Sequence, residues 1–350
     1  MMDLGYFNAR IRGMRGVLFS APEYEIFLKT ARIDELIERL KATPYGRNIE
    51  IAGARFQGLE DILASAMRDN LSDTFAALWK NAPSASAGLL KAALSIWEAA
   101  SLKAVIRGVD KGIKREEILR TTLPAGEFGI GALSVLAGSK DVSELQGYLE
   151  TWGSLYARPV RDGMEPYLKY QGLLDIELNI DRFIASSLLT GVSGRPLNGR
   201  IIMETLALRA DAANIMTLYK TANSGISQEG VSDIFLEGGV NLKKAAFLGL
   251  AVLKERDEIT GGLLKEIKER DLKDVLASAD YEDTGMMEEL FDDVIKRRLL
   301  RLSVIEPLSI ALALSFIYMK VREIKNMRLL AASKAFGIPD EELRRHLIYR

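Results

Sequence analysis

Apolar residues recur along this chain at intervals of three and four positions, the period of one face of an α-helix. The pattern is clear in four stretches, residues 33–41, 59–67, 89–107 and 242–254. Alternating apolar and polar positions bounded by hairpin turns, which would indicate β-strands, are hard to find. The 29 glycines and 9 prolines fall mainly between the periodic stretches, where they would begin or end helices. The sequence therefore predicts an all-α protein in which helices pack on helices.

The longest largely apolar run, residues 308–319, is well short of the roughly 20 residues that span a bilayer. It contains Ala and Ser and continues into a charged stretch, so we expect a buried core helix. The first sixteen residues lack the apolar centre that a secretory signal needs. Any work at a membrane would then be that of a peripheral partner.

Three parts of the chain resemble one another when the sequence is compared with itself. In each part an acid is followed by a small polar residue and then by a glycine: Glu98, Ser101 and Gly112; Asp211, Asn214 and Gly225; Glu323, Asn326 and Gly337. The acids recur at intervals of 113 and 112 residues, and the glycines recur at the same two intervals. The spacing from acid to glycine is therefore the same in all three parts. We infer three homologous helical domains, with approximate bounds 1–118, 119–231 and 232–350.

Each copy of this motif places its acid and its small polar residue on an otherwise apolar helix face, because both lie on one stripe at about 100° per residue. The glycine suits the left-handed position that ends a helix. We favour a role in helix packing over a catalytic or metal-binding role, since no His or second acid recurs at helical spacing beside these acids. A weaker echo precedes each copy, around Tyr45-Gly46, Trp152-Gly153 and Tyr281.

Composition narrows the function classes further. The 47 basic and 48 acidic residues give a net charge of -1, so no global field attracts nucleic acid. Cys is absent and His346 is the single histidine, so the two most versatile catalytic side chains are nearly missing. We predict no catalytic residue, no cofactor and no metal site.

The sequence FIYMKVREIKNMRLL at 316–330, followed by KAFGIP at 334–339, resembles the closing motif of a known family. That family comprises the C subunits of archaeal and bacterial V/A-type ATP synthases and the d subunits of eukaryotic V-ATPases. The opening YFNARIRGM at 6–14 is similar to the start of the same family. The first motif copy departs from the pattern at Ser101, where an Asn would be more typical.

The resemblance implies a funnel of three helical domains around a pseudo-threefold axis, with no active site of its own. It also implies a place on the cytoplasmic face of a membrane, held there through protein contacts. The partners would be the D and F subunits of the central stalk and the rotor ring of proteolipid subunits, with torque passing between them during proton or sodium transport. A nucleic-acid partner is not expected.

Two alternatives stay open at this point. The first is a helical-repeat scaffold unrelated to rotary ATPases. The second is an all-α, Mg²⁺-dependent enzyme of diphosphates, suggested by Asp292 and Asp293, although Lys296 stands where the final acid of such a motif belongs. Residues 194–201 have the glycine spacing of a phosphate loop, but Arg and Ile replace the required Lys and Ser or Thr.

Overall fold

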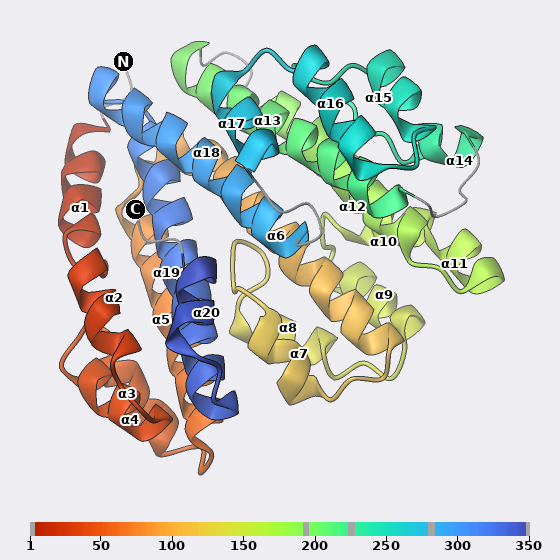
Figure 1. Ribbon diagram of the computed structural model, residues 1–350. Helices are drawn as coiled ribbons and strands as arrows, with labels where there is room; N and C mark the ends of the chain where they lie inside the picture. The colour runs from red at the N-terminus through yellow and green to blue at the C-terminus, as the bar shows by residue number, and fades with distance from the viewer. Residues whose placement is uncertain (1–3, 192–195, 223–227, 279–283, 348–350) are drawn as a thin grey trace. The chain divides into compact units, whose positions relative to one another are not determined.

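The fold is taken from a computed structural model, which describes residues 4–191, 196–222, 228–278 and 284–347. All regular secondary structure in these ranges is helical, and one isolated bridge joins Ala125 to Phe128. The predicted all-α class is therefore confirmed (Figure 1). Contacts divide the chain into two compact units, which are described separately: unit 1 comprises residues 1–158 and 312–350, and unit 2 comprises residues 159–311.

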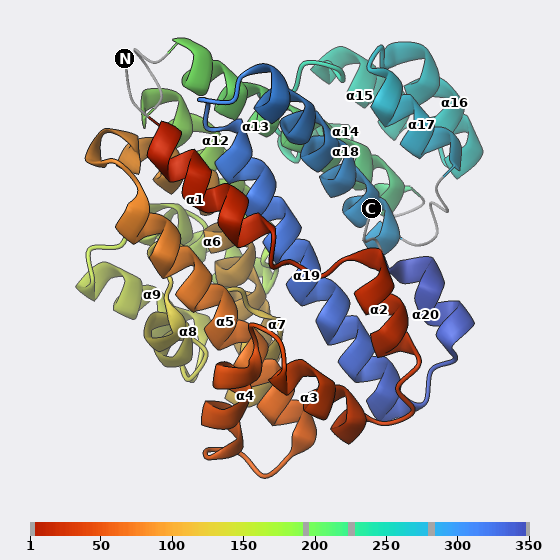
Figure 2. The same ribbon diagram turned by 90° about the vertical axis from the view of Figure 1, so that its left-hand side faces the viewer.

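Unit 1 combines the N-terminal helices with the C-terminal ones. Its helices are α1 (Gly5–Arg15), α2 (Ala21–Leu28), α3 (Ile33–Lys41), α4 (Gly46–Gly53), α5 (Leu59–Asn81), α6 (Ala87–Asp110), α7 (Arg115–Thr121), α8 (Ile130–Leu136), α9 (Val142–Thr151), α19 (Ala311–Phe336) and α20 (Asp340–His346). A short 3-10 turn, Ser84–Ser86, leads into α6. Figure 2 shows α1 on the outside of this unit.

Unit 2 is continuous in sequence. Its helices are α10 (Ala157–Asp162, which begins at the boundary), α11 (Met164–Tyr170), α12 (Leu174–Gly191), α13 (Pro196–Thr221), α14 (Gln228–Asp233), α15 (Lys244–Ala251), α16 (Arg256–Glu266), α17 (Arg270–Ser278) and α18 (Thr284–Ile305). Two long helices, α13 and α18, pack against each other within it.

The helices that carry the repeated motif, α6, α13 and α19, are the longest in the described ranges. They are buried around much of their circumference, because their apolar residues are not confined to one stripe. In unit 1, Trp97 of α6 meets Tyr318 of α19 edge-on, with ring centroids 4.9 Å apart. The motif helices therefore form the cores on which shorter helices pack.

The predicted helical stretches agree with the structure to different degrees. Residues 33–41 match α3, and residues 89–107 lie within α6. Residues 59–67 form only the first part of α5. The later turns of this helix carry Asn and Asp residues, so the apolar period predicted only its beginning. Residues 311–319 of the run 308–319 form the start of the buried helix α19, whereas Leu308 lies before the helix and is exposed.

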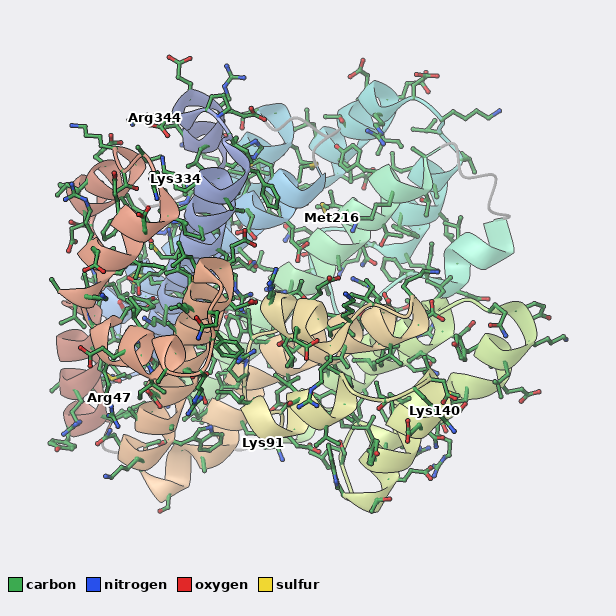
Figure 3. All side chains as sticks on the ribbon, turned by 90° about the horizontal axis from the view of Figure 1, so that it is seen from below. Arg47, Lys91, Lys140, Met216, Lys334 and Arg344 are labelled. Carbon is green, nitrogen blue, oxygen red and sulfur yellow. The ribbon has the colours of Figure 1, made fainter. Side chains whose placement is uncertain are left out.

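The two ends of unit 1 are joined by polar contacts as well as by apolar packing. Arg344 of α20 pairs with Glu25 of α2 at 2.5 Å. Lys334 of α19 donates to the carbonyl of Leu28 at 2.7 Å and pairs with Asp340 at 2.8 Å. Figure 3 shows Lys334 and Arg344 on the C-terminal helices, beside the N-terminal part of the chain. Residues that are more than 300 positions apart thus belong to one packing unit.

Within the described ranges, none of the helices combines the length and the apolar character needed to cross a membrane. The domain bounds 1–118, 119–231 and 232–350 stay a prediction.

Candidate functional site

The acid of the first motif copy, Glu98, lies in the middle of α6 and is only 2% exposed. Its carboxylate accepts a hydrogen bond from the backbone N–H of Glu127 at 2.7 Å and another from the hydroxyl of Tyr156 at 2.8 Å. Burial raises the pKa of Glu98, and the hydrogen bonds from Glu127 and Tyr156 lower it in part. The acid therefore fastens a later loop and a later aromatic residue to the helix.

The acid of the second copy, Asp211, does the same in unit 2 and is 0% exposed. It accepts the backbone N–H groups of Val240 at 3.2 Å, Asn241 at 3.0 Å and Leu242 at 3.0 Å. The side-chain amide of Asn241 adds a fourth donor at 2.9 Å. A carboxylate that binds several fixed N–H groups is stabilised in place, because charge-assisted hydrogen bonds are the strong ones.

The first two copies share the sequence separations of two of their contacts. Glu98 accepts the backbone N–H of Glu127, which lies 29 residues later in the sequence. Asp211 accepts the backbone N–H of Val240, which also lies 29 residues later. The small polar residues act in parallel, because Ser101 exchanges two hydrogen bonds with the backbone of Leu123 and Asn214 exchanges two with that of Leu236. Both separations are 22 residues. We call each buried acid with its donors a carboxylate junction.

In each of these two junctions a glycine lies where the carboxylate comes closest to the backbone of the loop. A Cβ on Gly126 would lie 1.3 Å from Oε1 of Glu98, and one on Gly239 would lie 2.2 Å from Oδ1 of Asp211. Gly126 also has a φ of 51°, which side-chain-bearing residues rarely adopt. Only glycine leaves room for the carboxylate to reach the backbone at these positions.

The third junction, around Glu323 of α19, draws its donors from the other end of the chain. Glu323 is 4% exposed and accepts the backbone N–H of Phe19 and the hydroxyl of Tyr45, each at 2.7 Å. The buried amine of Lys320 pairs with the same carboxylate at 2.8 Å and donates to the Tyr45 hydroxyl at 2.9 Å. Burial lowers the pKa of Lys320, and Glu323 opposes that change.

Asn326 of the third copy is buried beside this junction and hydrogen-bonds Tyr24 of α2. The pKa of Tyr24 is raised, chiefly by burial and then by the charge of Glu323, while the bond to Asn326 lowers it. The acid and the amide of α19 are thus both engaged with the N-terminal segment, residues 4–45.

The motif glycines that the structure describes both have left-handed backbones, with φ of 63° at Gly112 and 68° at Gly337. After α6, Gly112 donates to the carbonyl of Val109, and Ile113 donates to the carbonyl of Gly108. This pair of bonds satisfies carbonyls that the helix end leaves open. Gly225 lies outside the described residues.

Several residues of the junctions were not singled out from the sequence. They are Tyr156, Gly126, Gly239 and Lys320, whereas Tyr45 was noted only as part of the weaker sequence echo. A signal was available for the tyrosines, since each follows by two positions a hydroxyl residue that accepts its backbone N–H, Thr43 or Ser154. The sequence echo matched Tyr45 instead with the region of Trp152, and Tyr281 of the third echo lies outside the described residues.

The acids of the diphosphate-enzyme alternative are engaged in ion pairs within unit 2. Asp292 pairs with Arg209 at 2.8 Å. Asp293 pairs with Arg297 at 3.0 Å and also with Lys296. In the part of the chain that the structure describes, no three His, Asp or Glu side chains are grouped as metal ligands would be. The phosphate-loop spacing at 194–201 falls partly outside the described residues.

Comparisons with known proteins agree along nearly the whole chain. The family model described as ATP synthase (C/AC39) subunit matches residues 7–346. The A-type ATP synthase C subunit of Haloferax volcanii is 26% identical over 98% of this chain and 97% of its own length. Its counterpart in Haloquadratum walsbyi is 23% identical over the same shares. That of Methanocaldococcus jannaschii is 24% identical over 98% of this chain and 86% of its own length.

Proposed function

This chain belongs to the ATP synthase (C/AC39) subunit family, and we propose that it is a non-catalytic central-stalk adaptor of a rotary V/A-type ATP synthase. The observation that carries the proposal is the family match over residues 7–346, together with relatives named as C subunits of A-type ATP synthases that align over nearly the whole chain. The chain would couple the D–F central stalk to the proteolipid ring at the cytoplasmic face of the membrane.

The carboxylate junctions support this role on physical grounds. A body that transmits torque has to hold its long helices at fixed positions while the load changes. Each junction fastens a motif helix to a loop or segment distant in sequence through buried, charge-assisted hydrogen bonds. Such bonds are directional and resist sliding better than apolar contacts, which are not directional.

We also propose the arrangement of three repeat domains around a pseudo-threefold axis. Its support is the register of 113 and 112 residues, and the equal separations of 29 and 22 residues in the first two junctions. Three similar domains could close into a round body with a central hollow, which would receive the tip of the stalk.

The test is a titration of the purified chain with the D–F stalk and with the detergent-solubilised proteolipid ring, at low and high salt. We expect one-to-one binding to the stalk that weakens as salt screens its charged contacts. An absence of binding to both folded partners would contradict the adaptor role. Magnesium-dependent diphosphate turnover that is lost in an Asp292→Asn, Asp293→Asn variant would instead favour an enzyme.

A further inference from the structure

The first and third carboxylate junctions take their donors from segments that are built in the same order. The segment that serves Glu98 starts with the N–H of Glu127, continues through α8 and α9, and ends at the hydroxyl of Tyr156. The segment that serves the third acid starts with the N–H of Phe19, continues through α2 and α3, and ends at the hydroxyl of Tyr45. In both segments two helices separate an N–H donor from a tyrosine donor.

The ends of the two segments also agree in detail. The N–H of Tyr156 donates to the hydroxyl of Ser154 at 3.1 Å, and that of Tyr45 donates to the hydroxyl of Thr43 at 3.3 Å. A short helix begins directly after each tyrosine, α10 in one case and α4 in the other. The segment at the N-terminus therefore repeats the build of the segment that follows α7.

The second junction follows the same order as far as the structure describes it. Asp211 accepts the N–H groups of residues 240–242, and α15 begins two residues after the last of these donors. A short helix follows each motif helix, α7 after α6, α14 after α13 and α20 after α19. In the first two copies the donor segment continues from that short helix, whereas in the third copy it comes from the N-terminal part of the chain.

The N-terminal segment is fastened to the C-terminal helices at three further points, all of them on α2. These are polar contacts with α19 and α20: Asn326 with Tyr24, Lys334 with the carbonyl of Leu28 at 2.7 Å, and Arg344 with Glu25 at 2.5 Å. The ring of Phe19 also packs on those of Phe27 and Tyr45, with centroids 4.9 and 5.5 Å apart. Figure 2 shows α2 beside α19 and α20. The chain has no Cys, so every contact across this seam is non-covalent.

We propose that residues 17–45 are the displaced continuation of the third repeat and form a clasp that closes the three repeats into a cycle. The seam of this cycle lies between α20 and α2, which take the places of α7 and α8 in the first copy. Only α1 has no counterpart there, because the eight residues 122–129 connect α7 to α8 directly. The inference rests on the proposed three-repeat arrangement and holds whichever partners the chain binds.

The seam gives the fold a place where it can open while the other two junctions stay intact. Residues 126–156 are continuous with the chain on both sides, so they remain tethered twice when they detach. The clasp continues into α4 on one side, but on the other it carries only α1, which is held by packing of Phe7 and Ile11. A segment with one tether gains more conformational entropy on detaching, and we expect the clasp to open at lower free energy.

The first experiment compares hydrogen exchange in the clasp with exchange in residues 126–156, by mass spectrometry of peptides from the full chain. Glu323→Gln removes the charge of the third junction, and Glu98→Gln is the matched change in the first. We expect Glu323→Gln to speed exchange in the clasp by about tenfold or more and to leave residues 126–156 within about twofold. Glu98→Gln should show the reverse pattern. If Glu323→Gln speeds both segments equally, the clasp does not open by itself and the inference is wrong.

The second experiment moves the seam. A flexible linker of about 20 Gly and Ser residues, with a reach of roughly 60 Å, joins Arg350 to Met1. The chain is then opened between Ala125 and Gly126, which is the place in the first copy that corresponds to the seam. We expect native helix content by circular dichroism and an exchange of roles, in which residues 126–156 become the faster segment and the clasp the slower.

A matched permutant carries the same linker but is opened in the exposed turn between α11 and α12, at Gln171 and Gly172. Neither segment then lies at a chain end, so their exchange rates should differ less than in the native chain. If this control folds and the permutant opened after Ala125 does not, the two segments are not equivalent and the inference is wrong. If neither folds, the repeats do not form a cycle. Both experiments use the chain alone, so a failure to bind the stalk and the ring would end the adaptor role without touching the clasp.

Discussion

The first and third carboxylate junctions, both in unit 1, use the same motif in different ways. Glu98 is reached by donors that lie 29 and 58 residues further along the chain. Glu323 is reached by donors that lie 304 and 278 residues earlier. The same acid on the same helix face thus closes a neighbouring loop in one case and joins the two ends of the chain in the other.

The two junctions also differ in which groups stabilise the charge of the acid. At Glu98 the donors are an N–H and a hydroxyl, and Gly126 allows the close approach. At Glu323 the residue before the donor Phe19 is Leu18 and not a glycine. Lys320 supplies a buried positive charge beside this acid. The comparison suggests that a local junction is held by neutral donors, whereas the junction between the chain ends is held by an ion pair as well.

The largest difference between the junctions should appear when the acid is removed. Glu323→Leu leaves Lys320 buried without its carboxylate, and we expect a loss of about 4 kcal/mol in the free energy of unfolding. Glu98→Leu removes one acceptor from the Glu127 N–H and one from the Tyr156 hydroxyl but strands no buried charge, with an expected loss of about 2 kcal/mol. Urea denaturation of the two variants, with the native chain alongside, measures the difference.

A second substitution isolates the ion pair. In the double variant Lys320→Met, Glu323→Leu both charges are gone, so we expect about 2 kcal/mol of the loss to return. Equal losses for Glu323→Leu and Glu98→Leu would mean that Lys320 adds nothing to the third junction. A Glu323→Leu chain as stable as the native one would end the packing role of the motif acid altogether.

The next effect concerns the glycines, which only the first two junctions have. Gly126→Ala forces a side chain into a left-handed backbone and displaces the carboxylate of Glu98, for an expected loss of about 3 kcal/mol. Gly239→Ala should destabilise in the same direction through its contact with Asp211, by about 2 kcal/mol. Thermal and urea unfolding report both changes.

Other glycines in the chain provide the controls. Gly147→Ala and Gly249→Ala add a methyl group within a helix where no other atom lies within 4 Å, so they should be neutral or slightly stabilising. If Gly126→Ala behaves like Gly147→Ala, the first junction can shift without cost, and the glycine is not needed for the approach of Glu98.

Local regularities account for what the sequence could predict. The helical period shows in single stretches such as 33–41, so the all-α class followed directly. The motif acids and the glycines after them were visible because they recur at one interval. The family was visible because the closing motif is continuous in sequence.

The donors of the junctions could not be predicted in the same way, because they depend on which distant segments meet. Nothing in the local sequence connects Tyr45 with Glu323, which are 278 residues apart. Lys320 looks like an ordinary surface lysine until its helix is seen to be buried on nearly all sides. Gly126 and Gly239 share the repeat interval, but two glycines among 29 carry little information until their carboxylates are located.

The smallest expected effect is a pH dependence of the free energy of unfolding. It tests whether neutral donors alone stabilise the charge of the acid in the first junction. The folded pKa of Glu98 lies above its ordinary value of 4.5, so the folded chain retains a proton that the unfolded chain loses. The contribution of Glu98 to the free energy of unfolding should therefore fall as pH rises from about 4.5 through the folded pKa. Glu98→Gln cannot titrate, so the native free energy of unfolding minus that of the variant should decline as pH rises above about 4.5 in urea denaturation. A flat difference would mean that the donors of the first junction fully offset the burial of its charge, and that this junction needs no cation.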